Sequence, residues 1–512
     1  MADDKPTPEG LPSSMNRADN DESAAAPSLT RRSVRGFLWA LFSFGGGRLI
    51  VFGSTLVLAR LLTPDAFGVI AAGLAFIAYL QVLLDLGVGA TVVYEQEEGV
   101  GRRVQVAWTL NVVLAVVFGI AGVMLAPTLA NFFGASDQVN VFRVLSLSVI
   151  VTACALVPTK VLERDLDFRR RTWIELVPAA VRATVAISLA VAGFEVWALV
   201  IGYVAGEIVR VPVAWRLLRF LPRFVFDIPI LKSMLGYSLY IFGVAIVNSI
   251  ADYGDYFIVG GVLGTTALGF YTIAYKIPEM LLDAVYWVFS SVVFPAYSAA
   301  REIDAESLRS AVARSLGVIT FWGFSAGTLI SLAAGNVMVV VFGEKWLPAV
   351  APMMLVGIAL GLRSVRAGVS DVFPATGHPR TLMLLLIPET VVVLVAMVAV
   401  SSRGLTYIAG VLVVTELVFG SLQTTLAARL IGLKLGRVLR SLKGGFIAVL
   451  GIVALAVWPV ILVPPGLLGL ALTVCGGVLG GAIMLSLFGR ETIRDLRSIA
   501  DQAMSGRRAP DS

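Results

Sequence analysis

The sequence predicts an all-helical protein that crosses a membrane many times. Of its 512 residues, 58% are hydrophobic and only 14% are charged, and the mean hydropathy is +0.88. Apolar windows of about 20 residues, the length that crosses a hydrocarbon core as a helix, recur along nearly the whole chain. The alternating ten-residue pattern of a membrane β-barrel is absent from the sequence. Little of the chain is left for water-soluble domains.

About fourteen membrane spans are predicted. The loops after odd-numbered spans are short and nearly uncharged, whereas Lys and Arg collect in the loops after even-numbered spans and near both ends. The positive-inside rule therefore predicts that both termini are cytoplasmic. The predicted spans cover residues 37–60, 66–91, 105–130, 139–160, 173–193, 196–218, 234–260, 267–297, 308–334, 347–373, 380–400, 404–430, 441–463 and 466–488.

An internal repeat relates the first six spans to the next six. The stretch LARLLTPDAFGVI (58–70) aligns with IVGGVLGTTALGF (258–270), so that 63–68 corresponds to 264–269. Because an even number of spans separates the copies, both halves enter the membrane in the same direction, and such parallel repeats pack around a central cavity. We therefore predict two six-helix halves, 31–225 and 226–432, followed by two further spans in 433–490.

The two ends of the chain are polar. Residues 1–30 are acidic and rich in Pro and Ser, which predicts a disordered cytoplasmic tail, and 491–512 form a second cytoplasmic tail. No cleaved signal peptide is expected, because the first apolar segment has the length of a full span and follows Arg31, Arg32 and Arg35.

Several kinds of chemistry are not indicated. Cys154 and Cys475 lie in distant apolar segments and are expected to be buried, and a single histidine, His378, does not suggest a metal site. The sequence contains no phosphate-binding GxxxxGK[ST], no HExxH and no GxSxG. The net charge of +6 follows membrane sidedness, so it does not indicate nucleic-acid binding. We expect a transporter driven by an ion gradient, with no cofactor, rather than an enzyme.

Four basic residues lie inside predicted spans, where each costs roughly 2.5–3.5 kcal/mol on insertion scales if it faces lipid. They are Arg48, Lys276, Arg363 and Arg366, and the last two lie one turn apart on one helix face. We expect them to line a cavity and bind an anionic cargo. The alternative is that polar and acidic residues of other spans neutralise them: Gln81, Asp85, Asn248, Asp252, Asp255, Glu279, Asp283, Glu389 and Glu416.

The first predicted span contains SFGGGRLIVFGSTL (43–56), in which three glycines precede Arg48. The glycines allow another backbone or a ligand to come close, and the guanidinium group suits phosphate oxygens. We favour an Arg48 that faces a ligand. The alternative is a glycine-packed helix crossing in which Arg48 pairs with Asp85 or Asp255. Together with Asp252, these two carboxylates are the candidates for coupling to protons or sodium.

Two stretches resemble bacterial polysaccharide flippases. LARLLTPDAFGVIAAGLAFIAYLQVLLDLGVGATVVYEQE (58–97) is similar to their second-span region, and FGEKWLPAVAPMMLVGIALGLRSV (342–365) is similar to the segment that leads into their tenth helix. These flippases belong to the multidrug, oligosaccharidyl-lipid and polysaccharide exporter superfamily. Within it, the sequence most resembles the branch that exports colanic-acid or succinoglycan repeat units.

This resemblance implies a V-shaped pair of six-helix bundles. It implies that the cargo is an undecaprenyl-diphosphate-linked oligosaccharide, carried across the bacterial inner membrane for exopolysaccharide or lipopolysaccharide biosynthesis. Basic cavity residues bind the diphosphate in the family, and Arg48, Arg363 and Arg366 are the candidate counterparts. The implied partners are the lipid-linked oligosaccharide, the bilayer, and a polysaccharide polymerase with its export machinery. A monomer is expected, and no nucleic-acid partner.

Two other functions are alternatives to the flippase. A flippase is expected to have a net cationic cavity. A multidrug cation exporter of the same superfamily would have an acidic and aromatic cavity, which the carboxylates of spans seven and eight fit. A membrane glycosyltransferase or polysaccharide polymerase would need a large loop with catalytic residues after an odd-numbered span, and those loops are too short.

Overall fold

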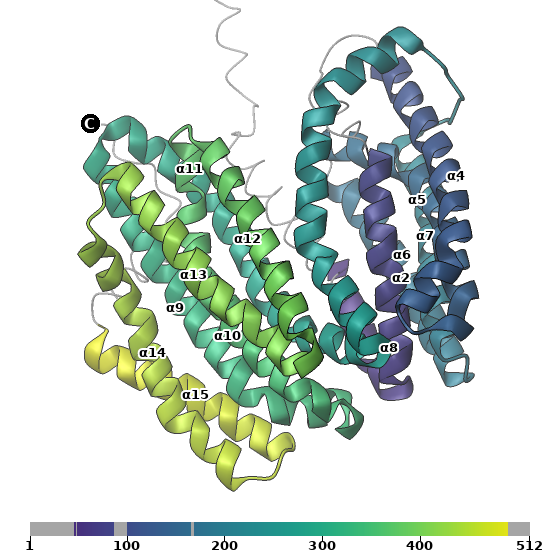
Figure 1. The fold of residues 1–512 in the computed structure, drawn as a ribbon. Coiled ribbons are helices and arrows are strands. Elements are labelled where there is room, and N and C mark those ends of the chain that lie inside the picture. Colours follow the sequence, from purple (N-terminus) through teal and green to yellow (C-terminus); the bar gives the residue numbers. More distant parts are fainter. Residues whose placement is uncertain (1–45, 48, 86–99, 165–167, 490–512) are drawn as a thin grey trace, which may run out of the picture.

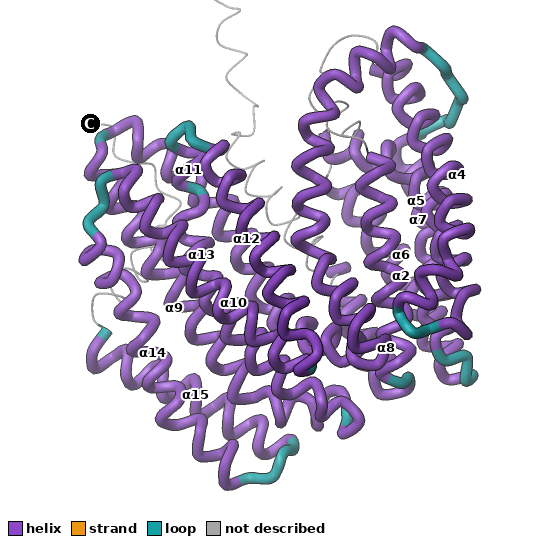
Figure 2. Tube along the Cα trace, in the orientation of Figure 1, coloured by secondary structure: helices purple, strands orange, loops and turns teal. Residues whose placement is uncertain are grey.

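The computed structural model describes residues 46–47, 49–85, 100–164 and 168–489, and these ranges contain helices and loops but no strand (Figure 2). Twelve helical segments among them are long and apolar enough to cross a membrane. The predicted all-helical, multi-pass membrane fold is therefore confirmed. The α-helices are α2 (Pro64–Asp85), α4 (Val100–Phe132), α5 (Val139–Arg164), α6 (Phe168–Val191), α7 (Val196–Leu218), α8 (Ile228–Ile303), α9 (Ala305–Val337), α10 (Val350–Ser370), α11 (Val372–Ala375), α12 (Pro379–Val400), α13 (Leu405–Ile431), α14 (Leu435–Leu462) and α15 (Leu467–Phe488).

Short helical turns connect several of these helices. Three are 3-10 turns, η1 (Ser136–Gln138), η3 (Glu344–Ala349) and η4 (Ser401–Arg403), and η2 (Met338–Phe342) is a π-helical turn. The starts of α8 and α9 are each capped by an aspartate side chain, Asp227 and Asp304. Before α9, for example, the Asp304 side chain accepts a hydrogen bond of 2.6 Å from the Ser307 N–H, which otherwise lacks a partner within the helix.

The predicted count of about fourteen spans is roughly consistent with these twelve segments. α8 has 76 residues and contains the two spans predicted at 234–260 and 267–297. Its backbone bends at Gly264, whose φ of 83° lies in the left-handed region that favours glycine. The first predicted span lies partly outside the described residues, and its described part forms a shorter apolar helix, Leu49–Leu61.

The helices form two groups that lie side by side (Figure 1). α2 and α4–α7 make up the first group, and α9, α10, α12 and α13 make up the second, while the long α8 packs against helices of both. α14 and α15 pack against each other and against α9. In Figure 1 the two groups meet at the lower end of the view and separate toward the upper end.

The two copies of the sequence repeat touch each other where the groups meet. A Cβ atom at Gly68 would lie 1.7 Å from the carbonyl oxygen of Thr265, and one at Gly269 would lie 1.9 Å from that of Pro64. The sequence shift that carries Pro64 onto Thr265 also carries Gly68 onto Gly269, so the two contacts are equivalent. The Thr265 hydroxyl also donates a 2.5 Å hydrogen bond to Asp65 Oδ1. The repeat thus forms a symmetric backbone contact.

A second junction lies beside this one. Lys345 of η3 donates hydrogen bonds to the carbonyl oxygens of Arg60 and Leu62, at 2.9 and 2.7 Å, and the Trp346 indole N–H donates to that of Ala59 at 2.9 Å. Carbonyl groups at the end of a helix have no partner within the helix and favour a nearby cation. Both junctions use loops after odd-numbered spans, so the halves meet on the side predicted to face away from the cytoplasm.

We predict that Gly68→Ala and Gly269→Ala each lower the thermal unfolding midpoint of the purified protein. Each added methyl group would meet a backbone carbonyl, and overpacking of this kind costs about 1–3 kcal/mol. Gly53→Ala is the control, because no neighbouring heavy atom lies within 4 Å of its added Cβ and alanine favours helix. An unchanged or higher midpoint for both junction variants would contradict the close contact.

Candidate functional site

A polar pocket of about 800 Å³ lies within the second group of helices, between α8, α10, α12 and α13. Its volume is in the range of about 300–1,000 Å³ that is typical of small-molecule sites. Both limbs of α8 contribute to the lining, and polar side chains of α10, α12 and α13 complete it. The charged lining residues are Asp252, Asp283, Arg363, Arg366, Arg380, Glu389 and Glu416.

The two arginines of α10 converge on one carboxylate oxygen. Arg363 Nε donates a hydrogen bond of 2.8 Å to Glu416 Oε1, and Arg366 Nη2 donates one of 2.9 Å to the same atom. Arg366 Nη1 also donates to Glu389 Oε1, and Arg363 Nη1 lies 3.9 Å from Asp283 Oδ1. The network therefore joins α10 to α8, α12 and α13, and it satisfies the buried charges in pairs.

Two polar atoms in this pocket remain without a hydrogen bond among the described residues. Glu416 exposes only 6% of its side chain, yet its Oε2 has no hydrogen-bond partner there. The buried Nε2 of Gln423, about two turns further along α13, has none either. A buried polar atom without a partner costs about 1–3 kcal/mol. Both atoms expose almost no surface, so a ligand or water could reach them only after neighbouring side chains move.

The charge of the pocket differs from the expectation of a net cationic cavity. Among the described lining residues, three are basic and four are acidic. Both arginines of α10 are already paired, as the alternative interpretation of the sequence predicted. An anion that binds to them must therefore displace a carboxylate, or a carboxylate must first take up a proton.

Lys276, which is also predicted to bind cargo, does not line this pocket. Its Nζ lies 3.7 Å from Glu279 Oε2, one turn further along α8. Arg48 lies outside the described residues, so its role stays a prediction. Its neighbours Gly46 and Gly47 are described. Added Cβ atoms there would lie 3.2 Å from the Leu176 side chain and 3.7 Å from that of Glu175, so these glycines pack against α6.

The three candidate coupling carboxylates are placed differently. Asp252 is exposed in the polar pocket. Asp255 is buried, and it accepts hydrogen bonds from the Tyr271 hydroxyl at 2.7 Å and from the Tyr256 N–H at 2.8 Å. Because Gly264 separates Asp255 from Tyr271, the first of these bonds links the two limbs of α8. Asp85 is the last residue of α2, and its side chain lies outside the described part of the chain.

Sequence reasoning missed a second buried ionic cluster, between α6 and α7. The Arg182 guanidinium carbon lies 4.9 Å from the centre of the Tyr203 ring, a distance typical of a cation–π contact. Glu207, whose side chain is 7% exposed, lies 3.2 Å from Arg210 Nη1. All four residues fall inside predicted spans. The criterion that identified Arg363, a charged residue inside a predicted span, therefore also applies to Arg182, Glu207 and Arg210. Sequence reasoning also did not identify Arg380 and Gln423, which line the polar pocket.

Comparisons with known proteins agree with this architecture. The succinoglycan biosynthesis transport protein ExoT of Rhizobium meliloti (strain 1021) is 25% identical over 339 residues, which cover 66% of this chain and 68% of the relative. The lipopolysaccharide biosynthesis protein WzxC of Escherichia coli (strain K12) is 24% identical over 351 residues, covering 66% and 69%.

Two solved structures show the same fold. A lipid II flippase MurJ in an inward closed conformation matches with a TM-score of 0.70 at 14% identity, over 89% of this chain and 100% of that one. An inward-facing multidrug resistance MATE family transporter of the MOP superfamily matches with a TM-score of 0.59 at 16% identity, over 75% and 94%. A family model described as polysaccharide biosynthesis protein matches residues 57–351, more than half of the chain, and this protein therefore belongs to that family.

Proposed function

We propose that this protein flips undecaprenyl-diphosphate-linked oligosaccharide repeat units across the bacterial inner membrane, for exopolysaccharide or lipopolysaccharide biosynthesis. In this proposal it is a transporter rather than an enzyme, acts as a monomer and has both termini in the cytoplasm. Family membership and the flippase-like fold support the proposal. The observation that carries it is the convergence of Arg363 and Arg366 on one anionic oxygen inside a membrane-spanning bundle.

The geometry suggests how a diphosphate would bind. Glu416 Oε1 occupies a position that two guanidinium groups reach at once, and a phosphate oxygen is an equivalent acceptor. The cargo diphosphate would take this position and displace Glu416. A proton or cation taken up by the displaced carboxylate would then couple cargo binding to an ion gradient. Asp252 lines the same pocket and is the first proposed coupling residue, and Asp85 and Asp255 are proposed as further ones.

Alternating access would follow from the two junctions between the halves. Their contacts hold one end of the molecule together, at Gly68 with Gly269 and at Lys345 with the end of the helix Leu49–Leu61. Rocking of one half against the other would break these contacts and open that end, as expected for parallel repeats. Arg48 and Lys276 are proposed to contact the diphosphate along this path.

A multidrug cation exporter is the second candidate function. The observation that favours it is the excess of carboxylates over basic groups in the pocket, with four against three. The two candidates differ in what binds: the flippase site takes a diphosphate, and the exporter site takes a lipophilic cation.

We predict that Arg366→Gln weakens binding of undecaprenyl diphosphate to the purified protein by about 10- to 100-fold. The substitution removes charge-assisted hydrogen bonds worth about 1.5–3 kcal/mol, and 1.4 kcal/mol corresponds to a factor of ten. Arg437→Gln is the control, because Arg437 pairs with Glu306 away from the pocket. An unchanged affinity in Arg366→Gln would remove this arginine from the cargo site. Tight binding of a lipophilic cation by the unsubstituted protein, with none of the diphosphate, would favour the exporter.

We predict that Asp252→Asn abolishes the acceleration of flipping by a proton or sodium gradient in proteoliposomes. The carboxylate faces the pocket and is exposed there, so it can exchange a cation with water. Asp304→Asn is the matched control, because Asp304 caps α9 between two spans and asparagine caps helices equally well. Acceleration by either gradient that persists in Asp252→Asn would contradict the coupling role.

A further inference from the structure

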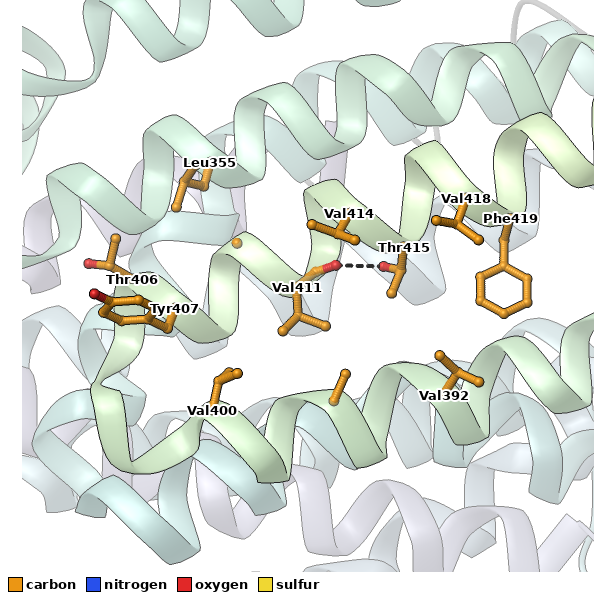
Figure 3. Close-up of a pocket in the computed structure, with 12 residues that line it drawn as sticks. Leu355, Val392, Val400, Thr406, Tyr407, Val411, Val414, Thr415, Val418 and Phe419 are labelled. Carbon is orange, nitrogen blue, oxygen red and sulfur yellow. Dashed lines mark hydrogen bonds between the residues drawn. The ribbon is translucent and has the colours of Figure 1, made fainter.

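An apolar groove of about 540 Å³ runs between α12 and α13 (Figure 3). α12 contributes Val392, Ala396 and Val400, and the facing side of α13 contributes Val411, Val414 and Phe419. Figure 3 shows Val392 and Val400 pointing toward α13, and Val411 and Phe419 pointing toward α12. No lining residue carries a charge. The groove therefore offers an apolar ligand a site between two membrane-spanning helices.

The corresponding seam in the other half of the repeat is closed. α6 and α7 are the repeat counterparts of α12 and α13, and they pack through Gly202 and Gly206. A Cβ atom at Gly202 would lie 2.7 Å from the Ala186 Cβ, and one at Gly206 would lie 3.1 Å from the Arg182 Cβ. On α13, by contrast, a Cβ atom at Gly410 would have no neighbouring atom within 4 Å. The groove is thus a feature of one half and does not follow from the duplicated fold itself.

The groove continues the polar pocket along the same pair of helices. On α12 the pocket is lined by residues between 379 and 394, and the groove by residues between 392 and 400. Thr415 of α13 lines both. Its hydroxyl donates a hydrogen bond of 2.9 Å to the Val411 carbonyl of its own helix, so it presents no free donor to the groove. The polar pocket and the apolar groove are therefore adjacent and share Thr415 as a lining residue.

We propose that the groove between α12 and α13 binds the prenyl chain of the lipid-linked cargo. This inference rests on the proposed function, because it takes the diphosphate to lie at Arg363 and Arg366. The chain is bonded directly to the diphosphate, so it must leave the pocket on one side, and on the side of Thr415 the apolar groove is adjacent. A phospholipid acyl chain in the groove would instead keep its headgroup at the bilayer surface, far from the arginines.

The groove follows α12 for about 12 Å, at a rise of 1.5 Å per residue, so it accommodates only the first part of a long chain. A short prenyl diphosphate is therefore a suitable probe. The test compares the affinities of dimethylallyl diphosphate and farnesyl diphosphate, which share one headgroup and differ by two prenyl units, for the full-length protein in lipid nanodiscs. We expect farnesyl diphosphate to bind about tenfold more tightly or better, because its additional methylene and methyl groups are buried.

Gly410→Leu fills the groove from α13 and Ala396→Phe fills it from α12. Each is expected to abolish the difference in affinity between the two probes and to leave the affinity for dimethylallyl diphosphate unchanged. Gly420→Leu is the matched control, because Gly420 also lies on α13 with no atom within 4 Å of an added Cβ but lines neither site. It is expected to keep the difference.

Three outcomes would overturn the inference, and they are distinguishable. If both filling variants keep the difference in affinity, the chain binds elsewhere while the diphosphate site stands. If a photoreactive phospholipid labels α12 and α13 and excess farnesyl diphosphate does not displace it, the groove is a site for bulk lipid. If neither diphosphate binds to the unsubstituted protein, the proposed function fails, and the groove inference fails with it.

Discussion

A charge buried at bilayer depth must be paired or hydrated, and this constraint organises the second group of helices. Arg366 of α10 reaches Glu389 of α12 and Glu416 of α13, while Arg363 reaches Glu416 and the second limb of α8. Removing one partner of a buried pair costs about 3–5 kcal/mol, because the other charge is left uncompensated. The network therefore fixes four helices around the pocket and makes their relative positions depend on the charge state of a few carboxylates.

The two halves of the repeat share a topology but differ at one seam between helices. Their equivalent turns meet in a symmetric backbone contact at Gly68 and Gly269, and the counterpart helices α7 and α13 each carry a buried glutamate that pairs with an arginine. In the first half, however, Gly202 and Gly206 close the seam between α6 and α7 around Arg182. In the second half the same seam is open, and it adjoins the polar pocket. The two halves thus differ in how closely one pair of corresponding helices packs.

The helices could be predicted well, because a span is defined by apolar length alone: the predicted 404–430 became Leu405–Ile431. The repeat alignment also anticipated that 63–68 and 264–269 are equivalent, but their contact depends on tertiary packing. For the site, the rule of mid-span charge identified Arg363 and Arg366 and named Glu389 and Glu416 as partners. This rule did not distinguish the two arginines from Lys276, which pairs with a residue of its own helix. The distinction depends on how each helix is rotated about its axis, and the sequence does not show this.

A pocket with more carboxylates than basic groups is compatible with an anionic cargo that must be released. Arginines left without partners would be costly before the cargo arrives and would then retain a diphosphate strongly. With Glu416 bound to both guanidinium groups, the net affinity of the proposed flippase for a diphosphate would be the difference between the binding free energies of two anions that compete for the same donors. A small change in the position or protonation of the carboxylate would then decide which anion is bound. Because α13 carries Glu416 and also one wall of the groove, a shift of this helix would change the environment of headgroup and chain together.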